Sequence, residues 1–539
     1  MTPFQEFRLW ARRAPGAERV SAALAAATIF GLLVWVVVPT GAGGSSNAST
    51  LKFGGPVGNS IPGAPGTGSG TGSATGPGTA PGVAPGTGPG TGTQSGTRTG
   101  TGPGTFRGTG VNAGKTCPAS NAKGVSNSQI KIGIGIVNIL GLNNNGTFGT
   151  ASVDLQEKAY TAAIDDLNAR GGIACRQVVK KFYQLDPSNQ TNLSSNCTQM
   201  ASDGMFALLD SGGFAQASTA YDCFSKYHIV YIGSYLVDED VREKNYPYIF
   251  EFAAYDRVYY NTVQGLKALN FLSPSNGFKK LGLLYRTCFQ NVVNRTYNWW
   301  LQAGLSSTQI YRAPIGCTQT GVTPDSTIRR AVINMHNAGV THVTYVESVA
   351  DIGSFSKDAQ QQGFHFKYGL PDDELVTLTQ IGSATAADGN QINGALAIAS
   401  ARDGEEVTAG QAPTAGTKRC DHLLAKEGVS STWRSPYAVG NACDDVWMLE
   451  AMVNHAPALQ SNAMAAGLQT AGSIDLSFPQ GPTYYRTQGE TAGGQYYRAV
   501  RFVRGGCPSW YSGSGHQGSS GGCWHVINPS YSRSTWRPA

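Results

Sequence analysis

The amino-acid sequence predicts an α/β protein built on parallel sheets flanked by helices. Across residues 129–235, the signals alternate in the order strand, helix, Gly-Gly turn, strand, helix, strand. A second series of the same kind begins near residue 254. The apolar runs of both series are short and rich in Val, Ile, Leu and aromatic residues, as in buried parallel strands. Strands that alternate with helices of this length form parallel sheets.

The first series opens with a strand over 130–136, in which isoleucines alternate with small or polar residues. A helix follows, because apolar residues recur at helical spacing from Tyr160, and Gly171-Gly172 ends it. Further strands are predicted at 205–209 and 229–232, with a helix around 215–227. Ligands bind at the carboxyl ends of such strands, which makes 210–214 and 233–237 the first candidate loops.

The second series continues the alternation to the end of the folded part. The predicted strands are 246–253, 280–285, 342–346, 366–370 and 394–399, and the predicted helices lie near 255–269, 292–305, 328–338 and 352–362. Residues 402–418 are polar and are expected to form a loop, and a long helix is expected over 437–455. A last strand is predicted at 495–503, before a Gly- and Ser-rich stretch at 512–522.

The amino end carries an apolar segment, 20–38, that contains no charged residue. Its length is close to the roughly 20 residues of a transmembrane helix. Arginines in residues 1–19 keep that end in the cytoplasm. We therefore expect a single-pass cell-membrane anchor with the folded part outside. A cleaved signal peptide, with 40–42 as the cleavage site, is the alternative, and the protein would then be secreted.

Residues 39–115 are almost entirely Gly, Thr, Pro, Ser and Ala, and this composition explains many of the 70 glycines. Such a segment has too little apolar side chain to offset its ordering entropy, so we expect a disordered linker. It serves either as a spacer between the membrane and the folded part or as a low-complexity insert without a selected length.

Ten cysteines all follow the apolar segment. No Cys-x-x-Cys pair and no zinc-finger spacing occur, so we expect no metal site and up to five disulfides in an oxidising compartment. The short-range pairs Cys197–Cys223, Cys288–Cys317 and Cys420–Cys443 would close modest loops. The net charge of +6 is spread along the chain, so nucleic-acid binding is not expected.

Catalytic motifs are not found. Gly-x-Ser-x-Gly occurs at 518–522, inside the Gly- and Ser-rich stretch and without a preceding strand. Asp165-Asp166 and Asp444-Asp445 place carboxylates on helices, but helical neighbours point about 100° apart, and we expect these groups to be solvated or capping. The sequence predicts neither an enzyme nor a cofactor.

The segment 164–173, Ile-Asp-Asp-Leu-Asn-Ala-Arg-Gly-Gly-Ile, is similar to a helix end found in type 1 periplasmic-binding proteins. More narrowly it resembles the branch of ABC-transporter substrate-binding proteins that binds leucine, isoleucine and valine. Asp186, 206–209 and 229–234 follow in the order of that family, and the resemblance covers about 129–510.

This resemblance implies the two-lobed type 1 periplasmic-binding fold, with three crossovers and hinge closure on a small molecule. Each lobe is then a parallel sheet flanked by helices. Lobe one is expected to be 116–253 and 402–490, and lobe two 254–401 and 491–525, with 526–539 as a tail.

The resemblance also implies candidate ligand contacts in lobe one. Ser211 and Gly213 lie in a loop where the family holds a ligand carboxylate, although glycines there also ease a tight turn. Ser234 and Tyr235 follow the next strand, where they bind the ligand or cap the next segment. Leu236 stands where the family has a Thr, which indicates a ligand other than the usual one.

In lobe two the implied contacts are Phe289, Glu347 and Asp372. Phe289 corresponds to a ring that covers the ligand, and Glu347 replaces an aromatic residue. Asp372 lies near the position of a carboxylate that meets a ligand amino group, and the acidic residues after it are expected to form a solvated turn.

We therefore expect a membrane-tethered solute-binding protein that captures a small polar ligand, such as an amino acid or a related amide. The family implies an ABC transporter permease as partner. A ligand-sensing or protein-interaction ectodomain on the same fold is the alternative.

Overall fold

The computed structural model describes much of the chain beyond residue 104, all of it in the unit Thr97–Ala539. The described residues are 105–107, 112–113, 115–139, 144–148, 150–187, 189–212, 218–233, 237–317, 325–346, 349–372, 386–402, 413–429, 439, 441–485, 490–507, 521–528 and 530–537. The side chains of 106, 107, 144, 147, 190, 218, 219, 349, 350 and 372 are not described. The predicted anchor 20–38 lies outside these residues. Among the helices that the structure describes, none is long and apolar enough to cross a membrane.

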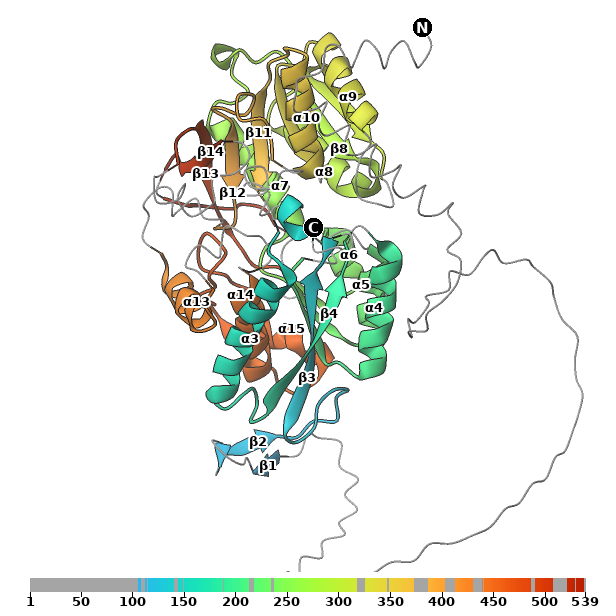
Figure 1. The fold of residues 1–539 in the computed structure, drawn as a ribbon, viewed down its shortest axis with the longest axis vertical. Helices are drawn as coiled ribbons and strands as arrows, with labels where there is room; N and C mark the ends of the chain where they lie inside the picture. Colours follow the sequence, from blue (N-terminus) through green and yellow to red (C-terminus); the bar gives the residue numbers. More distant parts are fainter. Residues whose placement is uncertain are drawn as a thin grey trace, which may run out of the picture. The chain divides into compact units, whose positions relative to one another are not determined.

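The first sheet has five strands in the order β4-β3-β5-β6-β7 (Figure 1). The strands are β3 (Gln129–Val137), β4 (Gln177–Leu185), β5 (Ala207–Asp210), β6 (Val230–Gly233) and β7 (Ile249–Glu251). All neighbouring pairs are parallel. The α/β class and the strands at 130–136, 205–209 and 229–232 are thereby confirmed.

Strand β4 and the helix α4 (Gln190–Asp203) were not predicted. β4 lies at the edge of the sheet and is only partly buried, with Lys181 exposed and Lys180 half-buried. A half-exposed edge strand has no continuous apolar run, so it escapes a search for buried strands. α4 begins after Asn189, whose side chain accepts a hydrogen bond from the backbone N–H of Asn192. It ends at Gly204, which has the left-handed conformation.

Helices cover both faces of this sheet (Figure 1). One face packs against α3 (Val153–Ala169), α13 (Ala415–Lys426), α14 (Asn441–His455) and α15 (Met464–Ala471), and the other against α4 and α5 (Ser218–Tyr227). Successive side chains of a strand point to opposite faces of the sheet. Leu209 therefore packs in the core beneath α3 and α14, and Leu208 packs in the core beneath α4 and α5. The expected loop over 402–418 is wrong at its end, because Thr414 caps α13 with its side chain.

The second sheet has eight strands, with β14-β13-β12-β11-β10-β8-β9 in order and β15 beside β13. The strands are β8 (Leu281–Arg286), β9 (Ile310–Ile315), β10 (His342–Val346), β11 (Lys367–Asp372), β12 (Leu396–Ala399), β13 (Tyr496–Arg504), β14 (Gly522–Val526) and β15 (Ser532–Arg533). It is parallel from β9 to β12. The expectation of a wholly parallel sheet is wrong at β13 and β14, which run antiparallel. No crossover helix separates these two strands among the described residues, and parallel strands need one.

Four helices cover the second sheet. These are α7 (Tyr255–Ala268) and α8 (Gln290–Gln302) on one face, and α9 (Asp325–Asn337) and α10 (Val349–Gln361) on the other. Helix α7 approaches β12 closely at Gly265, where a Cβ atom would lie 2.5 Å from Cδ1 of Ile398. Shorter described elements are α6 (Glu239–Lys244), η3 (Asn144–Phe148), η4 (Pro274–Asn276), η5 (Thr287–Phe289), η6 (Ser307–Gln309) and η7 (Ser461–Ala463).

The chain passes between the two sheets at residues 252–254, 400–402 and 490–495. The first and third passages lie side by side, because Glu251 forms a parallel bridge with Ala492. The second is held by Arg402, whose guanidinium donates to the carbonyls of Pro479 and Gln480. These passages agree with the crossovers that the resemblance implied, while the lobe boundaries themselves stay a prediction.

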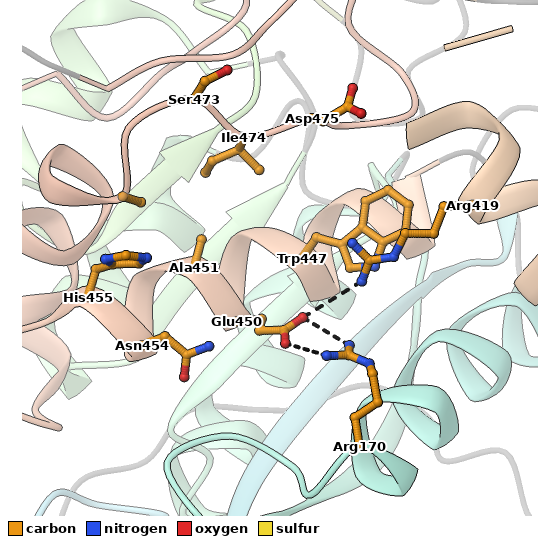
Figure 2. Close-up of a pocket in the computed structure, with 11 residues that line it drawn as sticks. Arg170, Arg419, Trp447, Glu450, Ala451, Asn454, His455, Ser473, Ile474 and Asp475 are labelled. Atoms are coloured by element: carbon orange, nitrogen blue, oxygen red, sulfur yellow. Dashed lines mark hydrogen bonds and ion pairs between the residues drawn. The ribbon is translucent and has the colours of Figure 1, made fainter. Parts of the chain in front are cut away.

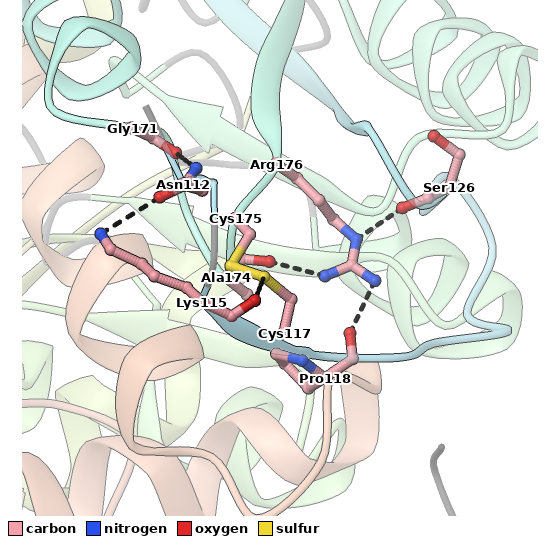
Figure 3. The surroundings of a disulfide bond; sticks show 9 residues. All are labelled: Asn112, Lys115, Cys117, Pro118, Ser126, Gly171, Ala174, Cys175 and Arg176. Atoms are coloured by element: carbon pink, nitrogen blue, oxygen red, sulfur yellow. Dashed lines mark hydrogen bonds between the residues drawn. A yellow bond between two sulfur atoms is a disulfide. The ribbon is translucent and has the colours of Figure 1, made fainter. Parts of the chain in front are cut away.

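The first described segment of the chain, the amino-terminal arm, is linked covalently to the first sheet (Figure 3). β1 (Thr105–Arg107) pairs antiparallel with β2 (Thr116–Pro118), and Cys117 forms a disulfide with Cys175. Buried Arg176 donates to the carbonyls of Ser126, Ala174 and Pro118. The expectation of a disordered linker up to residue 115 is therefore wrong at β1.

Five disulfides are present, as the cysteine count allowed. The three short-range pairs expected from the sequence are confirmed. The other two join Cys117 to Cys175 and Cys507 to Cys523.

Candidate functional site

The carboxyl edge of the first sheet is organised by Gln156, a fully buried residue of α3. Its side-chain oxygen accepts from the backbone N–H of Val137 at 2.9 Å, and its nitrogen donates to the carbonyls of Val137 and Ala151. Because Val137 ends β3, these bonds fix the first turn of α3 at the edge where ligands bind in parallel sheets.

Ser211, the first candidate contact, is fully buried at this edge. Its hydroxyl lies 2.8 Å from the carbonyl of Gly135 and 2.9 Å from Oε1 of Gln156, and its backbone N–H donates to the same carbonyl. These groups hold the end of β5 against β3. In this arrangement Ser211 supports the edge of the sheet rather than presenting its hydroxyl to solvent.

The structure describes only some of the other candidate residues. Gly213, Ser234, Tyr235 and Glu347 lie outside the described residues. Asp372 ends β11, where its backbone pairs with Ala399, and its side chain is not described. Phe289 is half-buried and directly precedes α8, next to the disulfide at Cys288. The roles of these candidates stay predictions.

A buried polar group that the sequence did not single out lies beside Ser211. Asp210 ends β5 and accepts a hydrogen bond from the hydroxyl of Tyr231 at 2.8 Å. Asp445 of α14 accepts one from Tyr160 of α3 at 2.6 Å. All four side chains are at most 2% exposed. Burial raises the pKa of Asp445, and the nearby carboxylates raise it further.

The expectation that Asp444 and Asp445 are solvated or capping is therefore wrong for this pair, since both are fully buried. Asp444 accepts from the backbone N–H groups of Ser477 and Phe478 at 2.7 and 2.8 Å. Burial nevertheless raises its pKa to about 7. Eleven of the 15 residues of α14 are buried, so the helix is enclosed on most sides and its two aspartates are buried with it.

Helices α3 and α14 run in the same direction. Tyr160 of α3 contacts Asp445 near the start of α14, and Arg170, just beyond α3, contacts Glu450 farther along α14. Since the start of α3 lies at the carboxyl edge, the start of α14 lies there too. Asn441, the first residue of α14, therefore belongs to this edge and is 1% exposed.

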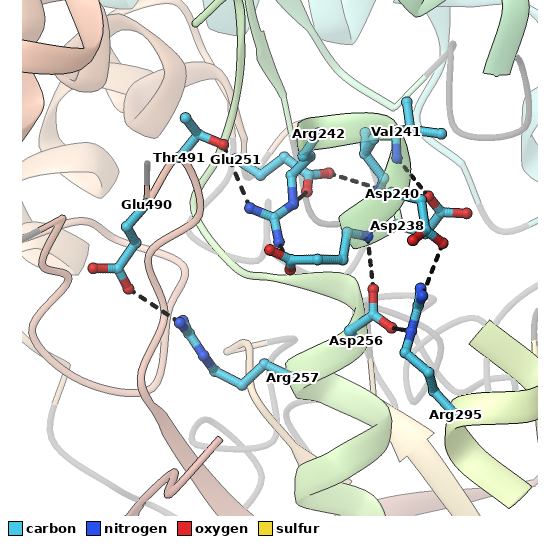
Figure 4. Close-up of polar contacts among 12 residues, drawn as sticks. Asp238, Asp240, Val241, Arg242, Glu251, Asp256, Arg257, Arg295, Glu490 and Thr491 are labelled. Carbon is cyan, nitrogen blue, oxygen red and sulfur yellow. Dashed lines mark hydrogen bonds and ion pairs between the residues drawn. The ribbon is translucent and has the colours of Figure 1, made fainter. Parts of the chain in front are cut away.

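A charged cluster surrounds the first and third passages between the sheets (Figure 4). Arg257 of α7 donates to the carbonyl of Gly493 and forms an ion pair with Glu490 at 3.1 Å. Arg295 of α8 joins Asp256 at the start of α7 to Asp240 of α6. These contacts link helices of the second sheet to segments of the first, beside the hinge positions.

The same cluster holds the segment that follows β6. The backbone N–H of Val237 donates to Glu251 at 2.8 Å, and that of Glu239 donates to Asp256 at 2.7 Å. Arg242 pairs with Glu239 in turn. Burial raises the pKa of Glu239 and lowers that of Arg257 to about 10. Val237 and Glu239 are thus each bonded to a buried carboxylate beside the hinge.

The carboxyl edge of the second sheet has its own buried ion pair. Arg286 ends β8, and its Nε lies 2.9 Å from Oδ2 of Asp351 in the first turn of α10. Both side chains are at most 6% exposed. This pair fixes β8 against α10 at the edge that carries Phe289.

A surface pocket of about 340 Å³ lies at the other end of α3 and α14 (Figure 2). Glu450 makes paired hydrogen bonds to Arg170, at 2.6 and 3.0 Å, and Arg419 stacks over the ring of Trp447. The guanidiniums there already have partners, and the strands of the first sheet end at the opposite edge. The pocket therefore does not coincide with the expected ligand site.

Several solved structures share the fold of this chain at low sequence identity. A solute-binding protein of an ABC transporter from Rhodopseudomonas palustris BisB5, in complex with 3,4-dihydroxy benzoic acid, matches with a TM-score of 0.53 and 12% identity, over 76% of this chain and 99% of that one. The closed leucine-, isoleucine-, valine-, threonine- and alanine-binding protein from Brucella ovis gives 0.51 and 12%, over 74% and 94%. A periplasmic binding protein type 1 from Bordetella pertussis Tohama I gives 0.50 and 16%, over 70% and 97%.

No family model and no curated protein matches the sequence. The structural neighbours are type 1 periplasmic-binding proteins and ABC substrate-binding proteins, including proteins that bind leucine, isoleucine and valine. The chain therefore has the type 1 periplasmic-binding fold that the sequence resemblance implied.

Proposed function

We propose that this protein is a non-catalytic, extracytoplasmic solute-binding protein that holds a small polar ligand between the carboxyl edges of its two sheets. The observation that carries the proposal is the pair of α/β units joined by three passages, with a charged cluster beside two of them. In proteins of this architecture, hinge closure traps the ligand.

We further propose a class of ligand and a protein partner. The neighbours are named for amino acids and for an aromatic acid, so the fold accommodates both classes. The sequence resemblance favours an amino acid or a related amide. Delivery to an ABC-type importer permease follows from the same resemblance. The anchor at 20–38 would tether the protein to the cell membrane, whereas cleavage after it would release the protein.

A thermal-shift screen against amino acids, amides, ureas and aromatic acids tests the function. A ligand at 100 times its Kd adds about 2.7 kcal/mol of apparent stability. Small-angle scattering with each hit then measures closure. A screen in which every compound leaves the melting temperature unchanged would contradict the proposal.

A ligand-sensing or protein-interaction ectodomain is the second candidate. It is favoured by an apolar segment at 20–38 with no nearby cysteine for lipid attachment. Co-purification from membranes separates the two, because an importer component copurifies with a permease and a sensor with another envelope protein.

A further inference from the structure

Asn441 and Asp445 form a pair of buried, incompletely bonded side chains on one face of α14. Residues four apart on a helix are neighbours, so the two side chains lie side by side. Asn441 is 1% exposed and Asp445 is fully buried. Within the part of the chain that the structure describes, Oδ1 and Nδ2 of Asn441 and Oδ1 of Asp445 make no hydrogen bond. Buried polar groups are normally hydrogen-bonded, so these atoms require a partner.

The pair lies at the edge where the proposed function places the ligand. On α3, Gln156 lies one turn before Tyr160 and bonds the last residue of β3. On the parallel helix α14, Asn441 lies one turn before Asp445, which bonds Tyr160. Asn441 therefore lies toward the same carboxyl edge of the first sheet as Gln156.

The charges around Asp445 determine which charge a group bound to this pair must carry. The titratable groups that face Asp445 are Tyr160 from α3, Asp210 from β5 and its neighbour Asp444, and none of them is a base. A carboxylate brought to this pair would be repelled by like charges at low dielectric. A cation would supply the missing counter-charge.

We propose that Asn441 and Asp445 form a subsite for the protonated amino group of the ligand, with Oδ1 of each side chain accepting one of its N–H groups. This inference rests on the proposed function and names one recognition element of the same site. Asp445 is ionised in the complex, and any proton that it carries in the ligand-free protein passes to solvent on binding.

The test uses isothermal titration calorimetry on the purified full chain with a panel of amino acids, each paired with its analogue that lacks the amino group, such as L-leucine with 4-methylpentanoate. We expect the amino acid of a pair to bind at least a hundredfold more tightly than its analogue. Asp445→Asn should weaken the amino acid at least tenfold. The control is Asp165→Asn, because this exposed carboxylate of α3 pairs with Lys180 and is not among the groups that face Asp445, so the change should alter the affinity less than threefold.

The pH dependence of the unmodified protein gives a readout that does not need a variant to fold. Below the pKa of ligand-free Asp445, the affinity for an amine should fall up to tenfold per pH unit, because binding must then expel a proton. We would measure it from pH 8 to pH 4, where the ligand amine stays charged.

The possible failures can be told apart. If only compounds without an amino group bind, or if amine binding is independent of pH and of Asp445→Asn, the subsite is disproved while the solute-binding function stands. If no compound of either kind binds, the proposed function and the subsite both fall.

Discussion

The hydroxyl of Tyr160 donates a 2.6 Å hydrogen bond to Oδ2 of Asp445, although 285 residues separate the two in sequence. Both side chains are fully buried. The bond joins α3, in the first α/β unit, to α14, which the chain reaches only after completing most of the second sheet. It therefore helps to define where the returning segment packs, and it sets α14 parallel to α3.

We predict that Tyr160→Phe destabilises the protein by about 1–3 kcal/mol, because it deprives a buried carboxylate of a donor. Urea unfolding measures the change. The matched control is Tyr183→Phe, since Tyr183 also donates at 2.6 Å to a carboxylate, Asp203, but that carboxylate is partly exposed and water can replace the hydroxyl. A loss at Tyr160 no greater than at Tyr183 would contradict the structural role of this bond.

The stability of the fold should depend on the titration of Asp444. Burial raises its pKa from 3.8 to about 7 in the folded protein, so the folded state holds a proton that the unfolded chain has released. Stability should therefore fall as pH rises from about 4 to about 7, by up to about 1.4 kcal/mol per pH unit from this group. Urea unfolding of the unmodified protein and Asp444→Asn across this range measures the difference. The variant should show the shallower slope, and equal slopes would refute the assignment.

The sequence predicted the elements whose apolar pattern is strong. The helix from Tyr160 to the Gly171-Gly172 turn and the strand at 342–346 are found where they were expected. Strand β4 was missed because an edge strand alternates apolar and charged residues over only part of its length. Tertiary contacts, which no local pattern carries, decide such a segment.

The candidate site was harder to predict than the fold. The polar groups at the edge, such as Gln156 and Asp445, reach it from helices, whereas the sequence analysis searched only the loops after strands. Adjacent aspartates on a helix also look alike in the sequence whether buried or solvated. Asp165 is exposed while Asp445 is fully buried, and only the packing of α14 against both α3 and the sheet distinguishes them.

The ion pair of Arg257 with Glu490 should contribute strongly to the hinge. Arg257→Met removes a buried ion pair and the donor to the carbonyl of Gly493, and breaking a buried pair in this way costs about 3–5 kcal/mol. Thermal unfolding measures it. Lys158→Met is the matched control, because Lys158 pairs with Asp154 on an exposed helix face and its loss should be barely measurable. Equal effects of the two variants would show that the hinge pair is no more important than a surface one.

The amino-terminal arm should be held by the disulfide and by Arg176 together. Cys117–Cys175 joins the arm covalently to the turn before β4, and the Arg176 guanidinium donates to the carbonyls of Ala174 in that turn, of Ser126 before β3 and of Pro118 on the arm. Lys115 is exposed next to β2, so trypsin reports whether the arm is docked. We predict that reduction alone leaves Lys115 slow to cleave, since Arg176 still binds Pro118. Arg176→Met should be cleaved several-fold faster after reduction, because the arm then loses both the covalent link and the Arg176 hydrogen bonds and keeps single contacts such as that from Asn112 to the carbonyl of Gly171. Cleavage at the same rate in the reduced variant and the reduced unmodified protein would show that Arg176 does not retain the arm.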